Sequence, residues 1–279
     1  MAQNKVLVLC GTGKVGRNTT VALKEAGFDV YATTRSTKSA SGLTSKGIKP
    51  VLANYADRKD LDRALSETGA KKMLMITDFF LAAKHSSDKE FEQGKMMIEA
   101  AKAAQIEHVI FISVSDADQF PLEGKTTTAS PSWPQECLHI KAKRQIEDYL
   151  IENPGNMTYS ILRPCAFFEN LDDAANYNPL KRGALKFLMT EKLKFCSTYD
   201  IGRAAAIQFK DPAKWNKKIL DVISWEGTLA DTAAALEKVG GVKVNHGLAM
   251  PIFARKVCVC VCVCVCVCVF CRSVIVTYI

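Results

Sequence analysis

The sequence contains no apolar run as long as the roughly 18 residues that a membrane-spanning helix needs. It also contains no basic run interleaved with aromatic residues, so its net charge of +8 does not indicate nucleic-acid binding. The short apolar run near the first residue lacks the length of a signal peptide. We therefore expect a cytoplasmic protein with no nucleic-acid or membrane partner. Its 279 residues can form one large domain, or a domain with a small appendage.

The first glycines of the chain follow a pattern typical of a dinucleotide-binding site. An apolar run over residues 5–10 leads into Gly11-Thr12-Gly13-Lys14-Val15-Gly16, followed by a helical pattern over residues 17–27 and a second strand over 29–34. In such a turn the first glycine makes the bend, the second lets the backbone approach a pyrophosphate, and the third lets the helix pack close to the sheet. The phosphates would lie at the helix N-terminus, where free N–H groups favour negative charge.

No acidic residue stands where the second strand ends, in Thr33-Thr34-Arg35-Ser36-Thr37-Lys38. NAD sites usually place an Asp or Glu there for the ribose 2′-hydroxyl, whereas an Arg accommodates the 2′-phosphate of NADP. A guanidinium and neighbouring hydroxyls can hold a phosphate through charge-assisted hydrogen bonds. The sequence therefore favours NADP over NAD, with Arg35 as the phosphate ligand. The alternative is that Arg35 and Lys38 lie in a solvated loop.

Strand-like and helix-like segments alternate along the rest of the chain. Beyond a polar connection over residues 36–46, we expect strands over 47–54, 72–77, 108–113, 158–163 and 219–223, and helices over 57–67, 89–105, 137–152, 200–209 and 229–239. This alternation predicts right-handed crossovers and an α/β fold with a doubly wound parallel sheet. Residues 166–255 offer too little for an independent core, so we expect a small C-terminal substrate lobe beside a main lobe of residues 1–165, which later strands continue. The long connection over residues 116–134 is typical of a binding loop.

Cysteine is distributed in two unlike ways. Cys10, Cys137, Cys165 and Cys196 are spread singly, as reduced thiols usually are, whereas seven cysteines lie in the tail, where valine and cysteine alternate from Val257 to Val269. A run of GT dinucleotides would be translated into this alternation, so we expect residues 256–279 to be an aberrant repeat that adds nothing to function. A soft-metal site and an edge strand are the alternatives. No histidine accompanies these cysteines, and we expect no metal site.

Two candidate catalytic residues, His139 and Lys143, lie four residues apart on a predicted helix and are therefore neighbours on one face. Lys143 stands at the shoulder of an apolar face, whereas Lys141 points to the opposite, solvated side. An amine in such a place can assist a proton transfer or hold a cofactor ribose. The alternative, which the spacing alone favours, is a lysine that extends to solvent beside a histidine with ordinary partners.

Several segments together resemble the NmrA-like family, atypical members of the short-chain dehydrogenase/reductase superfamily. The segments that carry the resemblance are residues 11–16, Arg35, 47–61, 139–149, 161–171 and 200–206. The most specific of them is Arg163-Pro164-Cys165-Ala166-Phe167-Phe168-Glu169-Asn170-Leu171. The resemblance covers residues 5–255 and implies a Rossmann-type NADP-binding lobe, with a small C-terminal lobe that closes over the nicotinamide.

The resemblance also implies a role for each residue of a cofactor site. The turn residues Gly11, Thr12, Gly13, Lys14, Val15 and Gly16 would hold the pyrophosphate, and Arg35 the 2′-phosphate. Asn54 stands where many relatives have an Asp beside the adenine, and Thr77 and Asp78 would close the fourth strand against the cofactor. Lys143 would lie near the nicotinamide ribose, and Pro164, Phe167 and Phe168 would line the nicotinamide pocket.

The chain departs from the Tyr-x-x-x-Lys pattern of classical reductases, because His139 stands four residues before Lys143. Histidine can act as an acid near neutral pH, so activity is compatible with the change. Three functions stay open. The first is an NADPH-dependent oxidoreductase of quinone- or enone-type acceptors, with the proton supplied by His139 or by a water that Lys143 relays. The second is a redox sensor that binds NADP(H) and acts through a regulatory protein partner, and the third is a truncated pseudo-enzyme.

Overall fold

The computed structural model of the chain describes residues 4–122, 137–171, 178–187 and 192–248. Its central sheet has seven strands in the order β10-β6-β5-β4-β1-β2-β3, and every neighbouring pair is parallel. The strands are β1 (Lys5–Val8), β2 (Asp29–Thr34), β3 (Lys49–Leu52), β4 (Lys72–Met75), β5 (His108–Ile112), β6 (Thr158–Pro164) and β10 (Lys218–Val222). The predicted doubly wound parallel sheet is confirmed, and its strand order reverses between β1 and β4.

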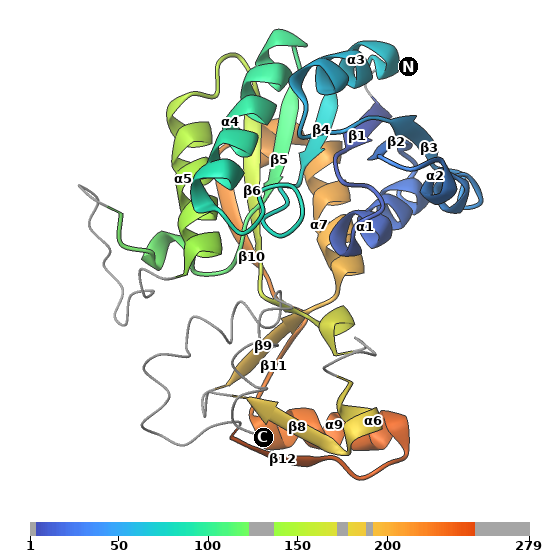
Figure 1. The fold of residues 1–279 in the computed structure, drawn as a ribbon, viewed down its shortest axis with the longest axis vertical. Coiled ribbons are helices and arrows are strands. Elements are labelled where there is room, and N and C mark those ends of the chain that lie inside the picture. Colours follow the sequence, from blue (N-terminus) through green and yellow to red (C-terminus); the bar gives the residue numbers. More distant parts are fainter. Residues whose placement is uncertain (1–3, 123–136, 172–177, 188–191, 249–279) are drawn as a thin grey trace.

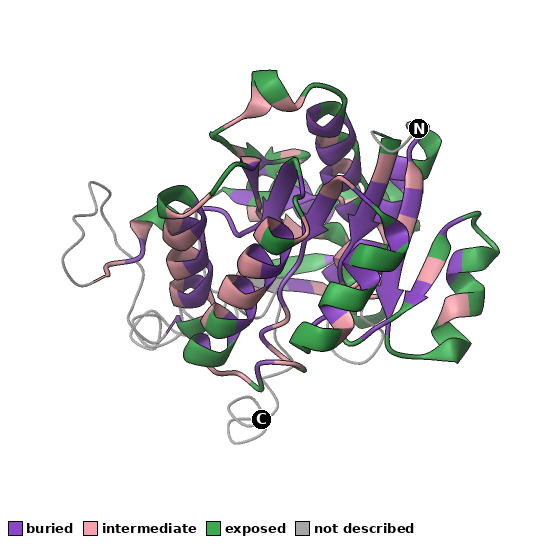
Figure 2. Ribbon diagram, turned by 90° about the horizontal axis from the view of Figure 1, so that it is seen from above, coloured by how far each residue is buried: buried purple, intermediate pink, exposed green. Residues whose placement is uncertain are grey.

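Helices cover both faces of this sheet (Figure 1). One face carries α3 (Arg58–Thr68), α4 (Ser87–Ala103) and α5 (Leu138–Glu152), and the other carries α1 (Lys14–Glu25), α2 (Thr37–Thr44) and α7 (Thr198–Lys210). Successive strand residues alternate between the two apolar clusters, so that Leu7 packs with the first set of helices and Val6 and Val8 with the second. Burial on both sides, visible as the purple interior of Figure 2, explains why these strands are continuous apolar runs.

A smaller lobe lies beyond the end of β6 (Figure 1). Its strands are β7 (Ala166–Phe167), β9 (Leu193–Cys196) and β11 (Trp225–Gly227) in one sheet and β8 (Ala184–Phe187) and β12 (Asn245–Leu248) in another, with α6 (Pro179–Arg182) and α9 (Leu229–Gly240) beside them. Its apolar cluster is small: Leu171, Leu185, Leu193, Phe195, Ala233 and Val244. Between these elements the chain returns to the main sheet through α7, α8 (Pro212–Trp215) and β10. The chain therefore passes back and forth between the two lobes after residue 165, and the lobe boundary at residue 165 stays a prediction.

The sequence prediction missed several elements of the fold. Residues 37–44 form α2 instead of a polar connection. Ser36 caps this helix by accepting a hydrogen bond from Ser39 N, and only Leu43 of the helix is buried, so no apolar period marked it. The small-lobe strands of two to four residues were too short to show alternation. Residues 123–134 of the predicted binding loop and the predicted repeat of residues 256–279 lie outside the described residues.

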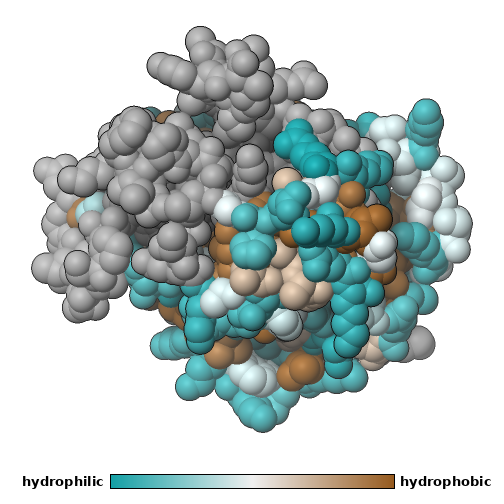
Figure 3. Space-filling view, turned by 90° about the horizontal axis from the view of Figure 1, so that it is seen from below, coloured by the Kyte–Doolittle hydropathy of each residue, from teal (hydrophilic) through white to brown (hydrophobic). Residues whose placement is uncertain are grey.

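Charged and apolar residues are mixed on the described surface. Seen from below, hydrophobic residues lie among hydrophilic ones (Figure 3). Within the described ranges, no helix is both long enough and apolar enough to cross a membrane. In the same part of the chain, no group of three or more His, Cys, Asp or Glu side chains is arranged to hold a metal ion.

Candidate functional site

The glycine turn between β1 and α1 is closely packed at each of its three glycines, where a Cβ would not fit. Gly11 N donates to Thr33 O at 3.0 Å, and a Cβ at Gly11 would lie 2.5 Å from Ala32 Cβ. A Cβ at Gly16 would overlap the carbonyl oxygen of Cys10. Gly13 is restricted as well, since a Cβ there would lie 2.9 Å from Cys10 Sγ. The turn therefore keeps the backbone of α1 close against the sheet.

The N-terminus of α1 offers free backbone donors. Gly13 is its N-cap residue, no side chain of the described residues caps it, and its first turn contains no acid. The N–H groups of Lys14, Val15 and Gly16 have no carbonyl one turn earlier in the helix, so they can bind an anion. The Lys14 side chain has a different partner, because its Nζ donates to Asn170 Oδ1 at 2.6 Å. In this arrangement Lys14 would contribute its backbone N–H, beside the exposed Thr12.

Arg35 and Asn54 follow the ends of β2 and β3, at the same edge of the sheet as the glycine turn. The Arg35 side chain is exposed, as the predicted role in holding a phosphate requires. Asn54 is also exposed, and its Oδ1 accepts a hydrogen bond from Ala56 N at 3.3 Å. The Asn54 side chain therefore supports a turn through Oδ1, and its Nδ2 can donate hydrogen bonds to other partners.

Thr77 and Asp78 follow β4 and have different surroundings. The Asp78 carboxylate organises the loop after the strand: Oδ1 accepts hydrogen bonds from Phe80 N and Leu81 N, and Oδ2 accepts one from the Tyr55 hydroxyl at 3.1 Å. Burial raises the pKa of the Tyr55 phenol, so the hydroxyl stays a donor. Thr77 is buried and points into a polar cluster below the sheet edge.

That cluster consists of Thr77, Glu90, His139 and Lys143. Lys143 Nζ donates to Thr77 Oγ1 at 2.7 Å and to Ile112 O at 3.2 Å, and lies 3.3 Å from Glu90 Oε1. His139 Nδ1 lies 3.0 Å from Glu90 Oε2, and Thr77 Oγ1 donates to Glu90 Oε1 at 2.7 Å. Burial alone would raise the pKa of the Glu90 carboxyl, but the charges of Lys143 and His139 outweigh it and lower the pKa to about 2.

Close packing of α4 on α5 brings this cluster together. Gly94 lies one turn after Glu90, and a Cβ there would be 2.6 Å from the Ile146 side chain. Ile146 in turn follows Lys143 by one turn of α5. The glycine thus lets the two helices approach where their polar residues meet. Sequence reasoning missed Glu90, although it follows the same period as the buried Gly94, Met97 and Ala101, which is a signal for a buried position.

Aromatic rings surround His139. Its ring centroid lies 5.2 Å from that of Phe79 and 6.0 Å from that of Phe80, and the ring of His85 lies 5.7 Å from Phe79. The His139 side chain is 11% exposed, compared with 5% for Lys143 and none for Glu90. These three side chains are therefore well shielded, and the histidine is the most accessible of them.

The segment after β6 joins the two lobes. Pro164 ends β6, Phe167 lies in β7, and the ring of Phe168 stacks on Phe195 at 5.3 Å while remaining 36% exposed. Further along, Glu169 Oε1 accepts hydrogen bonds from the N and Oγ1 of Thr198, at the start of α7.

Before this segment, Arg163 fixes α5 to β6. Its Nε and Nη2 donate to the two carboxylate oxygens of Glu147 at 2.9 and 2.6 Å. A paired geometry of this kind fixes orientation as well as distance. The helix that carries His139 and Lys143 is therefore held at a defined distance from the strand that leads to Pro164.

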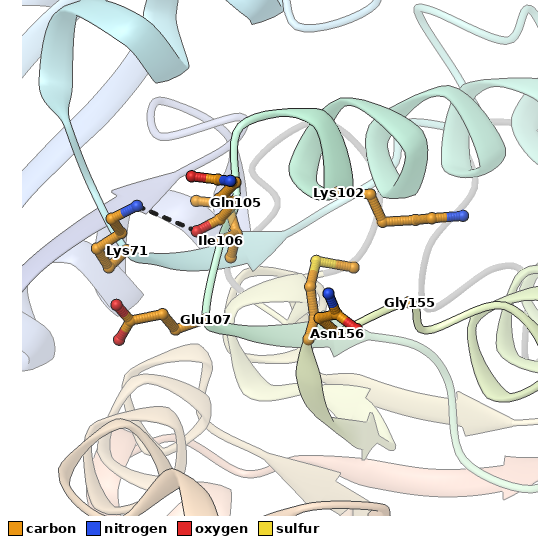
Figure 4. A pocket seen from close by; sticks show the side chains of 8 residues that line it. Lys71, Lys102, Gln105, Ile106, Glu107, Gly155 and Asn156 are labelled. Carbon is orange, nitrogen blue, oxygen red and sulfur yellow. Dashed lines mark hydrogen bonds between the residues drawn. The ribbon is translucent and has the colours of Figure 1, made fainter.

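A hollow on the opposite edge of the sheet contains none of the predicted site residues. It is lined by Lys71, Lys102, Gln105, Ile106, Glu107, Gly155, Asn156 and Met157, from the segments that precede β4, β5 and β6 (Figure 4). Lys71 Nζ donates to Gln105 O at 3.2 Å, whereas the Lys102 ammonium points away from it (Figure 4). In open α/β sheets ligands bind beyond the carboxyl ends of the strands, where the order reverses. The glycine turn, Arg35, Asn54 and Thr77 lie at that edge.

Comparison with known proteins gives one family and one fold. The sequence model of the NmrA-like family matches residues 2–256. The Citrobacter sp. triphenylmethane reductase complexed with NADP(H) is a similar solved structure, 18% identical over 88% of this chain and 79% of that chain, with a TM-score of 0.67. An NADPH-dependent quinone oxidoreductase of Escherichia coli complexed with NADPH is 22% identical over 94% of this chain and 88% of that chain, with a TM-score of 0.66. The Thermus thermophilus UDP-glucose 4-epimerase complex with NAD is 16% identical over 87% of this chain and 85% of that chain, with a TM-score of 0.64. At these identities the likeness shows a shared Rossmann-like α/β fold.

Proposed function

The chain belongs to the NmrA-like family, and we propose that it is an NADPH-dependent oxidoreductase that reduces quinone- or enone-type acceptors. The observation that carries the proposal is the arrangement at one edge of the sheet. There, a glycine turn and an uncapped helix N-terminus lie at the end of β1, and the buried Thr77–Glu90–His139–Lys143 cluster lies at the end of β4. Two reductases of the same fold are complexes with NADP(H) or NADPH, which supports this cofactor and this reaction class.

The residues present fit a dinucleotide. The glycine turn lets the backbone approach a pyrophosphate, and the N–H groups at the start of α1 would bind it. The exposed Arg35 would hold a 2′-phosphate, and its neighbours in the sequence, residues 33–38, contribute hydroxyls and no carboxylate. This chemistry favours NADPH over NADH. Asn54 would lie beside the adenine, where an amide can still hydrogen-bond.

The cluster supplies the proton chemistry that such a reduction needs. When bound, NADPH supplies a hydride, which carries both electrons. The acceptor oxygen then takes one proton, which His139 can give as an imidazolium and recover from solvent through its exposed part. Lys143 Nζ already faces Thr77 Oγ1, Ile112 O and Glu90 Oε1, so it would contact the nicotinamide ribose only by exchanging one of these three partners. Pro164, Phe167 and Phe168 would line the nicotinamide pocket.

The test is calorimetry with NADPH and NADH, followed by NADPH oxidation with a panel of quinones and enones. We expect tighter binding of NADPH and turnover with at least one acceptor that falls by about 10²-fold or more in His139→Ala. Glu99→Gln, at a partly exposed carboxylate of α4 that pairs with Lys102 and accepts a hydrogen bond from Tyr149, is a control that should keep full activity. Binding without turnover across the panel would favour the alternative of a redox sensor that acts through a protein partner. Failure to bind either nucleotide would favour the truncated pseudo-enzyme.

A further inference from the structure

We propose that Glu90 is a positioning residue for His139 and Lys143. Its carboxylate fixes the proton of His139 on Nδ1 and leaves Nε2 as the atom that exchanges a proton with the acceptor. The proposal rests on the proposed function and deepens it. Glu90 comes from α4, whereas the two residues it would position come from α5.

The two carboxylate oxygens of Glu90 contact different residues. Oε2 lies 3.0 Å from His139 Nδ1, and Oε1 accepts the Thr77 hydroxyl at 2.7 Å and lies 3.3 Å from Lys143 Nζ. The Glu90 side chain is fully buried, and the Lys143 side chain is 5% exposed. In the part of the chain that the structure describes, His139 Nε2 has no hydrogen-bond partner.

The charge state of Glu90 determines the tautomer of His139. A carboxylate that stays ionised at neutral pH can only accept hydrogen bonds, so His139 Nδ1 must be the donor. The remaining nitrogen, Nε2, then carries a proton in the imidazolium and a lone pair in the neutral ring. A fixed anion on Nδ1 also stabilises the imidazolium, the form that can give a proton to an acceptor oxygen.

Other charges near His139 act in both directions. The described titratable groups around its ring are Glu90 on α4, Lys143 on α5 and, beyond the ring of Phe79, His85 in the loop after β4. Lys143 is a cation and opposes a second positive charge on His139. The Glu90 carboxylate lies between the two and contacts both, with Oε2 toward His139 and Oε1 toward Lys143.

Stability alone does not explain this cluster. A fully buried carboxylate beside two cationic side chains loses much solvation, and well-packed apolar residues of similar volume are often equally or more stable. Glu90, His139 and Lys143 nevertheless meet at the end of β4, at the edge where a dinucleotide would bind. The desolvation of a buried ionised group at a ligand-binding edge is expected where that group takes part in the reaction.

The first test reads the tautomer directly, without cofactor. Long-range ¹H–¹⁵N NMR of the imidazoles in the full chain should show that neutral His139 carries its proton on Nδ1. In Glu90→Gln the amide can donate as well as accept, so a large fraction of the proton should move to Nε2. Glu99→Gln, on the same helix, should leave the tautomer unchanged. A neutral wild-type His139 protonated on Nε2 would overturn the proposal, even if Glu90→Gln does not fold.

The second test reads the chemistry. Glu90→Gln should lower kcat of NADPH oxidation by about 10²-fold and alter its dependence on pH, while NADPH affinity changes much less. A wild-type rate in Glu90→Gln, or a lost rate with the His139 tautomer unchanged, would overturn the role of Glu90. Absence of turnover in the wild type with every acceptor would instead overturn the proposed function, and the tautomer would still decide the question of Glu90.

Discussion

Acid should remove the stability that the ionised Glu90 gives to the fold. Desolvation alone would raise the pKa of this carboxyl, but Lys143 and His139 lower it from 4.5 to about 2. Because the pKa is lower in the folded chain than in the unfolded one, the stabilisation is fully present above pH 4.5 and is lost as the pH falls toward 2. At about 1.4 kcal/mol per pKa unit, the carboxylate contributes about 3 kcal/mol to the free energy of unfolding.

Urea denaturation of the wild type and of Glu90→Gln between about pH 5.5 and pH 2.5 measures this contribution. The histidines of the unfolded chain stay protonated throughout this range, so they add no pH dependence from the unfolded state. The wild type should lose about 2.5 kcal/mol more than Glu90→Gln across the range, because pH 2.5 is still above the folded pKa. Glu99→Gln, whose carboxyl pairs with Lys102 near the surface, should follow the wild type closely. Parallel curves for the wild type and Glu90→Gln would refute the ionised, charge-paired state of Glu90.

Three further changes test the cofactor site, the helix packing and the tail. Arg35→Ala should weaken NADPH binding by about 1.5–3 kcal/mol and leave NADH binding unchanged, with Lys38→Ala as the control; calorimetry that gives equal affinities of the wild type for both nucleotides would contradict this. Gly94→Ala should cost about 1–3 kcal/mol of stability, because its Cβ would lie 2.6 Å from Ile146, and the double variant with Ile146→Ala should cost less than the sum of the two single changes. Additive costs in urea denaturation would show that this contact does not limit the approach of the helices. Deletion of residues 256–279 should leave NADPH affinity unchanged and improve solubility, whereas a lower melting temperature, or a zinc-dependent rise seen only in the full chain, would show that the repeat has a structural role.

The sheet was predictable because its strands are buried on both faces. Residues 6–9 are fully buried and form a continuous apolar run, a pattern typical of a parallel strand. The glycine turn was predictable for a steric reason, since Gly11 and Gly16 lie where no Cβ fits. By contrast, α2 buries only Leu43, and β8 and β12 are only four residues long. None of these three elements therefore shows a hydrophobic period in the sequence.

The site was predictable only where its geometry is local. His139 and Lys143 are one helical turn apart, so their adjacency follows from the sequence. Glu90 is 49 residues away from His139, and the two meet only because α4 packs on α5 at Gly94. The sequence nevertheless held a signal. Ser87, Glu90, Gly94, Met97 and Ala101 follow one apolar period, and all five are buried.

A charged residue at a buried position of an amphipathic helix needs a partner of opposite charge or hydrogen-bond donors, because burying an unpaired carboxylate costs too much free energy. In this chain the predicted helix of residues 137–152 offered two basic side chains, His139 and Lys143, on the side that carries its apolar residues. Two helices that cover the same face of a sheet can bring such positions together, which makes Glu90 their natural partner. In this chain, the acid at a buried position of one helix and the His-x-x-x-Lys on its neighbour together indicate a buried acid–base group, although neither pattern does so alone.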